Sequence, residues 1–271
     1  MKGRSLKDLF HRVEQVLPDE QELITVPPNM CVRDALDIMT RYNLSQVPVV
    51  TGNEVLGVFS YRSFSRGILQ IGNKEQDPAG LPVEAFAEDL KYAQITDELI
   101  GLLDEFDLRD AVLIGTESRL QGIVTTVDAL RYFYRVASPY VMLGEIELAI
   151  RELMWASVNS QELNECINRC IKGYYEEKSL KVPTCLEEMT FSDYISILRF
   201  KRYWDKFSDR FGGAYLVMQT KLRCLPELRN DVLHFRRELT AEEYDTLRDV
   251  RDWLLKRIRK LEASRKIVRN G

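Results

Sequence analysis

The segment Leu228–Phe235 brings together side chains that can act on a phosphodiester. Arg229 and His234 are separated by four residues, and the polar residues Asn230 and Asp231 follow the arginine directly. An imidazole can take a proton from a ribose 2′-hydroxyl or give one to the leaving 5′-oxygen. A guanidinium can hold the phosphate with two hydrogen bonds and stabilise the charge that develops on it. Side chains of these types can together cleave RNA without a metal ion and leave a 2′,3′-cyclic phosphate, with Asn230 and Asp231 orienting the pair.

Glu147 and Arg151 also lie four residues apart and can pair on one helix face. With these residues the C-terminal half resembles the HEPN family of helical domains, many of which are ribonucleases. The resemblance implies that Arg229 and His234 are catalytic and that a homodimer brings two such motifs into one cleft. The alternative is a structural Arg229–His234 pair in a bundle that only dimerises or binds a partner protein.

Thr125 and Asp128 form a second candidate site, at the end of a predicted strand and the start of a predicted helix. A carboxylate there can accept hydrogen bonds from both hydroxyls of a ribose, and the hydroxyl of Thr125 can reach a phosphate or ribose oxygen. A helix N-terminus also favours an anion. The alternative is that Asp128 only caps its own helix.

The residues Gly122–Asp128 resemble the end motif of the CBS (cystathionine-β-synthase-type) domain, whose tandem pairs commonly bind adenine nucleotides. The resemblance covers about residues 20–136. It implies ATP, ADP or AMP as a regulatory ligand, the backbone at Asp110 and Ala111 as the base-reading segment, and Arg62 or Arg66 near the phosphates. Ser63 stands where the second copy has Asp128, so one competent site is expected, built mainly by the second copy.

An internal repeat must position these residues. Residues 24–69 and 90–133 each predict a helix, a short strand, a turn, a second strand and another helix. The strand signals stop after Tyr134, and Pro139 is expected to break the chain. The remainder predicts helices over residues 140–158, 162–177, 190–207 and 240–266, with Thr190 and Thr240 as caps. A further helix is predicted within residues 211–225 after the break at Gly212 and Gly213, and it continues over residues 228–235 beyond Pro226.

The predicted fold class is therefore α+β: tandem CBS repeats of short strands packed with helices, then an all-α helical bundle. We expect an N-terminal helix over residues 1–19, a nucleotide-sensing module over 20–137 (copies 20–70 and 83–137), and a helical domain over 138–271. The 271 residues carry a net charge of −4, which is unevenly distributed. Residues 1–137 hold 14 basic and 21 acidic residues, and residues 138–271 hold 24 and 21. Bulk charge therefore disfavours a polyanion at the front half.

The composition favours a cytoplasmic protein. No apolar run approaches the ~20 residues of a membrane span, and the N-terminal segment lacks the apolar core of a signal peptide. Five scattered cysteines and two histidines make a metal site improbable and favour reduced, packed thiols.

Together these features predict a nucleotide-regulated, metal-independent endoribonuclease of the toxin or antiviral-defence type. The partners are a regulatory adenine nucleotide, an RNA substrate and a second copy of the chain, with residues 129–144 as the transmitting segment. The alternative is a non-catalytic nucleotide sensor whose helical domain mediates dimerisation or partner binding.

Overall fold

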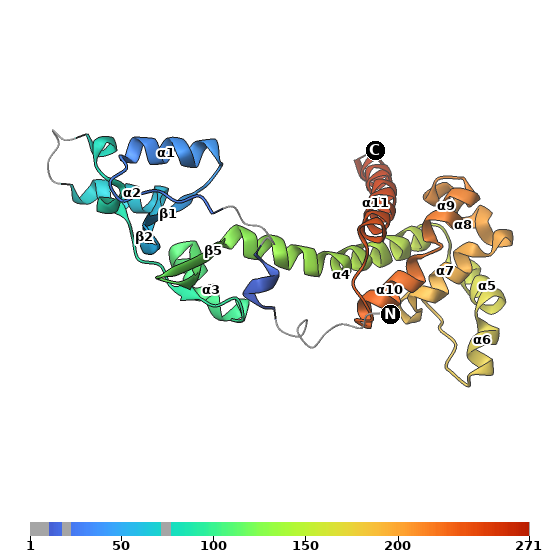
Figure 1. Cartoon of the computed structure of the whole chain (residues 1–271). Coiled ribbons are helices and arrows are strands. Elements are labelled where there is room, and N and C mark those ends of the chain that lie inside the picture. Colours follow the sequence, from blue (N-terminus) through green and yellow to red (C-terminus); the bar gives the residue numbers. More distant parts are fainter. Residues whose placement is uncertain (1–10, 18–22, 72–76, 271) are drawn as a thin grey trace. The chain divides into compact units, whose positions relative to one another are not determined.

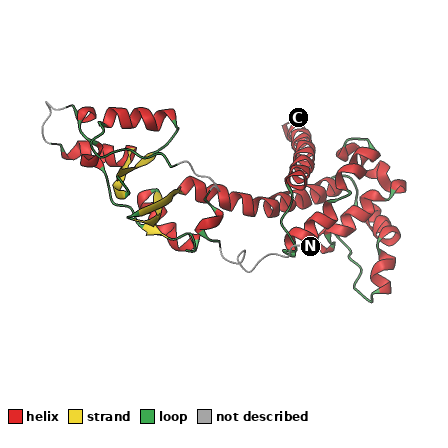
Figure 2. Ribbon diagram, in the orientation of Figure 1, coloured by secondary structure: helices red, strands yellow, loops and turns green. Residues whose placement is uncertain are grey.

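The computed structural model describes residues 11–17, 23–71 and 77–270, with the backbone alone for 267–270. It contains two compact units, which divide between Tyr134 and Arg135. Strands occur in the first, here called the N-terminal unit, while the second, the helical unit, is built from helices in its described part (Figure 2). The structure thus has the mixed α+β class that the sequence predicts.

The N-terminal unit contains the two copies of the repeat, coloured blue to cyan and green in Figure 1. Its elements in chain order are the 3-10 turn η2 (Val13–Gln15), α1 (Val32–Arg41), β1 (Gln46–Thr51), β2 (Glu54–Ser60), α2 (Tyr61–Gln70), the 3-10 turns η3 (Pro78–Gly80) and η4 (Val83–Phe86), β3 (Tyr92–Ala93), η5 (Leu99–Leu102), α3 (Leu103–Arg109), β4 (Ala111–Thr116), β5 (Arg119–Thr125) and the start of α4 (Thr126–Trp155).

Each copy is built around an antiparallel hairpin, β1–β2 and β4–β5, and both hairpins carry a register shift at the same place. A short extended segment runs parallel to the first hairpin strand in each copy. It is a single bridge from Val26 to Val49 in the first copy and the strand β3 beside β4 in the second. The predicted helix–hairpin–helix repeat is therefore confirmed.

The two hairpins are held together by the apolar cluster of Val55, Val58 and Leu113. The segment that joins the copies lies tightly against β2, because Val58 exchanges both backbone hydrogen bonds with Glu88. Gly57 makes this approach possible: a Cβ there would lie 3.0 Å from the carbonyl oxygen of Glu88. This contact fixes the position of Glu88 and Asp89.

The helical unit encloses one large apolar core, in which Tyr194, Phe191, Phe207 and Phe211 are among the largest fully buried side chains. After the end of α4 its elements are α5 (Ser160–Cys170), α6 (Lys172–Glu177), η6 (Leu186–Glu188), α7 (Phe191–Arg199), η7 (Lys201–Tyr203), α8 (Trp204–Phe211), α9 (Tyr215–Leu222), α10 (Leu225–Leu233) and α11 (Ala241–Asn270).

The helix boundaries confirm several predictions and correct others. Thr190 and Thr240 cap α7 and α11, with Asp193 and Glu243 completing the hydrogen bonds. The prediction that Pro139 breaks the chain is wrong, because α4 continues through it. Proline removes the N–H that would reach the carbonyl of residue 135, and the hydroxyl of Ser138 donates to that carbonyl instead, over 3.3 Å.

Two predicted single helices are each divided. The helix expected over 162–177 is interrupted at Ile171, and the one expected over 190–207 is interrupted at Phe200, whose backbone is extended. Ile171 and Phe200 are neither Gly nor Pro, so the sequence gives no helix-breaking signal at these two positions. Residues 1–10 and 18–19 of the predicted N-terminal helix lie outside the described residues, and its described part holds the 3-10 turn η2.

Candidate functional site

Thr125 and Asp128 close the start of α4 with three hydrogen bonds. The hydroxyl and backbone N–H of Thr125 donate to Oδ2 of Asp128 over 2.6 and 3.0 Å, and the Asp128 N–H donates back to that hydroxyl over 3.2 Å. Ser60 and Ser63 make the equivalent capping box at the start of α2. The capping role that the sequence allowed for Asp128 is thus present.

Capping occupies only one oxygen of the Asp128 carboxylate. Within the described part of the chain, Oδ1 has no hydrogen-bond partner, and the residue is half-buried. A carboxylate can accept through both oxygens, so the cap leaves Oδ1 able to bind a ligand hydroxyl. Ser63 has one oxygen, which already donates to the Ser60 carbonyl and accepts from the Ser60 N–H.

Asp110 connects this helix start to the first copy of the repeat. Its backbone lies in the left-handed region, with φ of 64°, and its carbonyl accepts from the N–H of Thr126 over 3.0 Å. Its carboxylate pairs with Nη1 of Arg62 at 3.0 Å. The structure therefore brings together two of the residues predicted for the nucleotide site.

The base-reading role predicted for Asp110 and Ala111 meets a constraint. The Asp110 N–H donates to the carbonyl of Phe106, so both backbone groups of Asp110 already have partners in the chain. Ala111 is fully buried in β4, opposite Thr125 in β5. The Asp110 carbonyl also accepts from the Thr126 hydroxyl over 3.3 Å, so a base at this place would have to contact Asp110 through its carboxylate.

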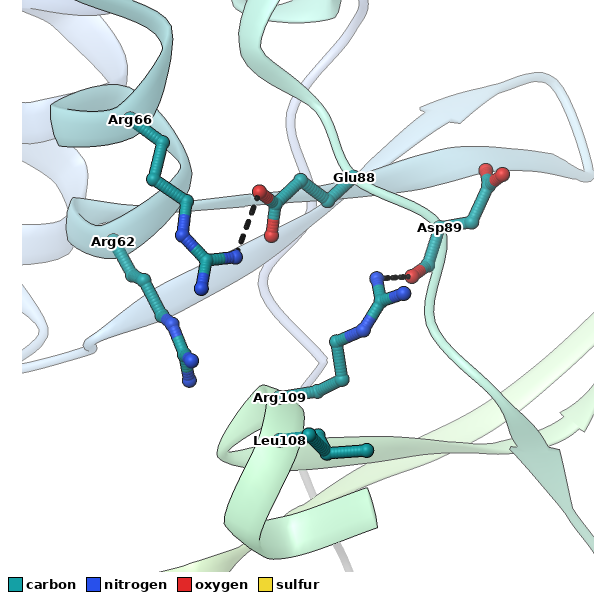
Figure 3. A pocket seen from close by; sticks show the side chains of 6 residues that line it. All are labelled: Arg62, Arg66, Glu88, Asp89, Leu108 and Arg109. Carbon is teal, nitrogen blue, oxygen red and sulfur yellow. Dashed lines mark hydrogen bonds and ion pairs between the residues drawn. The ribbon is translucent and has the colours of Figure 1, made fainter. Parts of the chain in front are cut away.

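Next to Asp110 lies a hollow of about 440 Å³, here called the arginine hollow. Figure 3 shows its lining residues: Arg62 and Arg66 from α2, Glu88 and Asp89 from the segment beside β2, and Leu108 and Arg109 from the end of α3. Arg66 pairs with the Glu88 carboxylate at 3.4 Å, and Arg109 donates to the backbone carbonyl of Asp89 over 2.6 Å.

More guanidiniums than carboxylates line the arginine hollow, and the carboxylate of Asp110 pairs with Arg62 beside it. Three guanidiniums line it, whereas Glu88 and Asp89 supply two carboxylates, and in Figure 3 the Asp89 side chain points away from the arginines. Arg62 and Arg66 were considered for phosphate binding from the sequence. Arg109, Glu88, Asp89 and Leu108 were missed, although the position of Arg109 directly before Asp110 was a usable signal.

A second hollow, of about 420 Å³, lies at the turn between β4 and β5. Its lining includes Tyr92, Gln94 and Glu117. Burial, followed by the nearby carboxylates of Glu117 and Asp89, raises the pKa of the Tyr92 hydroxyl above its ordinary value. This hollow lacks a cationic side chain among its lining residues, so it is the less suitable place for a phosphate.

In the helical unit, Arg229 and His234 lie at different depths. Arg229 lies inside α10 and is half-buried, while His234 is the exposed cap at the C-terminal end of that helix. The His234 side chain has no hydrogen bond or ion pair with any described residue, so its ring nitrogens are accessible.

Arg229 belongs to a charged cluster around α4. Its Nε lies 3.9 Å from Oε2 of Glu147 and has no hydrogen-bond partner among the described residues. Glu147 pairs with Arg151 at 3.2 Å, which confirms the predicted pair, and Arg151 donates to the Tyr194 hydroxyl over 3.1 Å. The Arg229 guanidinium also lies over the ring of Phe191, 5.8 Å from its centre.

The two polar residues of the motif have other contacts. Asp231 is buried and pairs with Arg237 at 2.8 Å and with Arg236 at 3.9 Å. The backbone carbonyl of Asn230 accepts from the His234 N–H over 3.1 Å. The bond from His234 to Asn230 is an ordinary helical backbone bond, while the Asp231 carboxylate pairs with the loop that follows α10.

The chain can be compared with known proteins. A model of the CBS domain matches residues 13–69. The A-adding tRNA nucleotidyltransferase of Geobacter sulfurreducens is 29% identical over 137 residues, which is 48% of this chain and 15% of that protein. The inosine-5′-monophosphate dehydrogenase of Methanocaldococcus jannaschii is 26% identical over 135 residues, 48% of this chain and 26% of that protein. The chain thus spans a small part of these curated relatives.

Solved structures with CBS domains also match. The CBS-domain containing protein ATU1752 from Agrobacterium tumefaciens has a TM-score of 0.41 at 18% identity, over 45% of this chain and 92% of that one. The CBS domain pair of protein MJ0100, solved with 5′-methylthioadenosine and S-adenosyl-L-methionine, has a TM-score of 0.39 at 18% identity, over 46% of this chain and 96% of that one.

None of the described helices combines the length and apolarity needed to cross a membrane. The N-terminal unit contains a CBS domain at residues 13–69.

Proposed function

We propose that the protein is an adenine-nucleotide sensor joined to a metal-independent endoribonuclease, of the kind that acts in toxin or antiviral-defence systems. ATP, ADP or AMP binds the N-terminal unit, and a homodimer of the helical unit cleaves RNA. The observation that supports the sensor best is the arginine hollow beside the Arg62–Asp110 pair.

The proposed sensor has candidate groups for the ribose and for the phosphates of a nucleotide. The free Oδ1 of Asp128 accepts from a ribose hydroxyl. The guanidiniums of Arg62, Arg66 and Arg109 hold the phosphates, because planar N–H forks match phosphate oxygens. Asp110 links the two places through its bonds to Arg62 and Thr126.

Calorimetry of the full chain with ATP, ADP, AMP and adenosine tests the sensor. The proposal expects Asp128→Asn to weaken nucleotide binding, while Ser63→Ala, at the equivalent place in the first copy, leaves it unchanged. Absence of binding by the wild-type chain to all four ligands would contradict the sensor.

The ribonuclease is supported by the accessible imidazole of His234 and the fixed guanidinium of Arg229. The imidazole takes the proton of the 2′-hydroxyl, whose oxygen attacks the phosphorus while the bond to the 5′-oxygen breaks. Arg229 stabilises the charge on the phosphate oxygens. A second His234, from the other copy, gives the proton to the leaving 5′-oxygen.

Regulation requires a ligand that binds two arrangements of the protein with different affinity. Residues 129–144 remain the proposed transmitter, because they belong to α4, which carries Asp128 in its first turn and Leu153, a core residue of the helical unit, near its end. RNA cleavage measured with and without each nucleotide tests this coupling.

The second candidate is a non-catalytic sensor whose helical unit serves dimerisation or partner binding. The contacts of Arg229 with Glu147 and Phe191 favour it, since an arginine held in this way can be purely structural. Nucleotide binding without RNA cleavage under any ligand would select this candidate.

A further inference from the structure

Helix α4 exposes large apolar side chains at a spacing of seven residues. Val141, Leu148 and Trp155 are 57%, 61% and 60% exposed, although each is followed or preceded by residues of the buried core. Counting back in sevens along the same helix gives Tyr134 and Val127, which are exposed as well. Soluble chains rarely leave such an apolar row in water, so this spacing calls for a covering partner.

The positions between these residues complete a heptad pattern. Ala137 and Gly144 are exposed, lie seven residues apart, and precede Val141 and Leu148 by four residues; Arg151 is the next position in that row. A repeat of seven with two rows is the pattern by which two helices pack along a shared seam. We call Ala137, Val141, Gly144, Leu148 and Trp155 the α4 stripe. Among the described helices of the helical unit, α4 is the one with exposed large apolar residues in this repeat.

We propose that the α4 stripe is the seam on which a second copy of this chain docks, with the two α4 helices antiparallel. A seam with a seven-residue period fits a partner helix of the same period, and α4 itself has that period. The residues assigned to the seam lie in the helical unit. Its relevance for catalysis rests on the proposed ribonuclease.

Side-chain volume selects the antiparallel direction. In an antiparallel pair, the row of Val141, Leu148 and Trp155 faces the partner's row of Ala137, Gly144 and Arg151. Leu148 then meets the partner's Gly144, and Trp155 meets the partner's Ala137. Large side chains then fill the space above small ones, as a well-packed core requires. A parallel pair would place Trp155 against its own copy and leave an empty layer at Gly144.

Charge selects the same direction. In a parallel pair Arg151 would face Arg151 of the other copy, and like charges at one level destabilise an interface. In the antiparallel pair Arg151 lies level with the partner's Val141, and its guanidinium keeps the pairing with Glu147 at 3.2 Å. The flanking carboxylates Glu145 and Glu152 pair with Arg251 and Arg265 of the same chain, so they bring no unpaired negative charge to the seam.

The seam passes beside the candidate catalytic cluster. Glu147 and Arg151 flank Leu148, and Glu147 lies 3.9 Å from Arg229. Two copies related by a twofold axis at this seam therefore bring both Glu147–Arg229 clusters next to the shared interface.

Gly144 provides a clean test. A Cβ at this position meets nothing within 4 Å in the chain, so Gly144→Glu is tolerated by the fold and improves helix propensity. In the seam it would collide with the partner's Leu148. We expect the wild-type chain to be a dimer by sedimentation equilibrium, and Gly144→Glu to raise the dissociation constant at least ~30-fold, as loss of an interface hot spot does.

Leu216→Glu is the matched control, because Leu216 is an equally exposed apolar residue on α9, and it leaves the dimer intact. A wild-type chain that remains monomeric at ~100 μM, well above the dissociation constants of specific interfaces, overturns the proposal. A Gly144→Glu variant that dimerises like the wild type overturns it too.

The direction is tested by disulfide formation between single-cysteine additions, mapped by mass spectrometry. An equimolar mixture of Ala137→Cys and Trp155→Cys chains is expected to give the 137–155 cross-link. Self-cross-linking of Ala137→Cys in place of that product overturns the antiparallel seam. The molecular mass in solution and the cross-links do not depend on catalysis. A dimer that does not cleave RNA contradicts the proposed ribonuclease alone. RNA cleavage by a monomer contradicts the catalytic role of the seam alone.

Discussion

The hydroxyl of Thr125 donates to Oδ2 of Asp128 over 2.6 Å, so one side chain serves as a helix cap with one oxygen and keeps the other for a ligand. The first copy of the repeat has the same cap but uses two serines, Ser60 and Ser63. The local structure is thus equivalent in the two copies, whereas the charge that can select a ribose is present in the second.

Asp128→Asn separates these two roles. The amide oxygen can still accept from Thr125, so we expect the melting temperature to change little. The lost charge weakens hydrogen bonds from ribose hydroxyls, and ATP affinity should fall about tenfold or more. Calorimetry and thermal unfolding of the same preparation measure both effects. Equal affinity in variant and wild type would show that Asp128 is a cap alone.

Arg109→Ala tests the arginine hollow. One charged hydrogen bond to a phosphate contributes about 1.5–3 kcal/mol, so ATP affinity should fall about 10-fold to 100-fold. Adenosine, which lacks phosphates, should bind as before. Arg33→Ala is the control, since Arg33 forms an exposed pair with Asp77 and does not line the hollow. An equal loss for ATP and adenosine would contradict phosphate binding at Arg109.

The Arg237–Glu243 pair should stabilise the helical unit in a pH-dependent way. Arg237 holds Glu243 at 2.6 Å and is the main cause that lowers the Glu243 pKa to about 2 from 4.5. Because the folded pKa is the lower one, the stabilisation is complete above pH 4.5 and is lost as the pH falls towards 2.

Glu243→Gln removes this contribution and the charged cap acceptor for Thr240. We expect urea denaturation to show a loss of about 1–2 kcal/mol at neutral pH that shrinks in acid. Glu242→Gln, in the same helical turn and exposed, is the control. A difference between variant and wild type that is the same at pH 7 and pH 2.5 would rule out this pairing.

Cys166 should react slowly in the folded protein. Burial is the main cause that raises the pKa of its thiol to about 11, and the neighbouring Cys170 has a pKa of about 11 for the same reason. At pH 8 each of the two thiols is then a thiolate, the reactive form, in only about one molecule in a thousand. Alkylation followed by mass spectrometry should label both after denaturation and leave them largely unmodified before it.

The sequence predicted the repeat, both hairpins and the caps at Thr190 and Thr240, because these features depend on local periodicity and on side chains three residues apart. The predicted break at Pro139 was wrong, because the Ser138 hydroxyl donates to the carbonyl that proline leaves without its backbone donor. This hydrogen bond forms only once the helix exists, so the sequence does not show it. Arg62 and Asp110 were each assigned to the nucleotide site, but their contact spans 48 positions and requires the packed repeat.

The remaining site residues escaped prediction for a similar reason. Arg109 and Glu88 have no motif of their own, and only the tight approach of Glu88 to Val58 brings them to the same hollow. In the helical unit, Glu147 and Arg151 were paired correctly because four residues separate them, whereas the contact between Glu147 and Arg229 depends on how α4 and α10 pack.

RNA cleavage in the presence of EDTA tests the proposed function most directly. Labelled RNA is incubated with wild-type protein, His234→Ala and the chain's other histidine variant, His11→Ala, each with and without ATP. The account predicts fragments with 2′,3′-cyclic phosphate ends from the wild type and His11→Ala, a rate that ATP changes, and a 10²–10⁴-fold slower reaction for His234→Ala. Cleavage by His234→Ala at the wild-type rate, or cleavage that requires a metal ion, would contradict it.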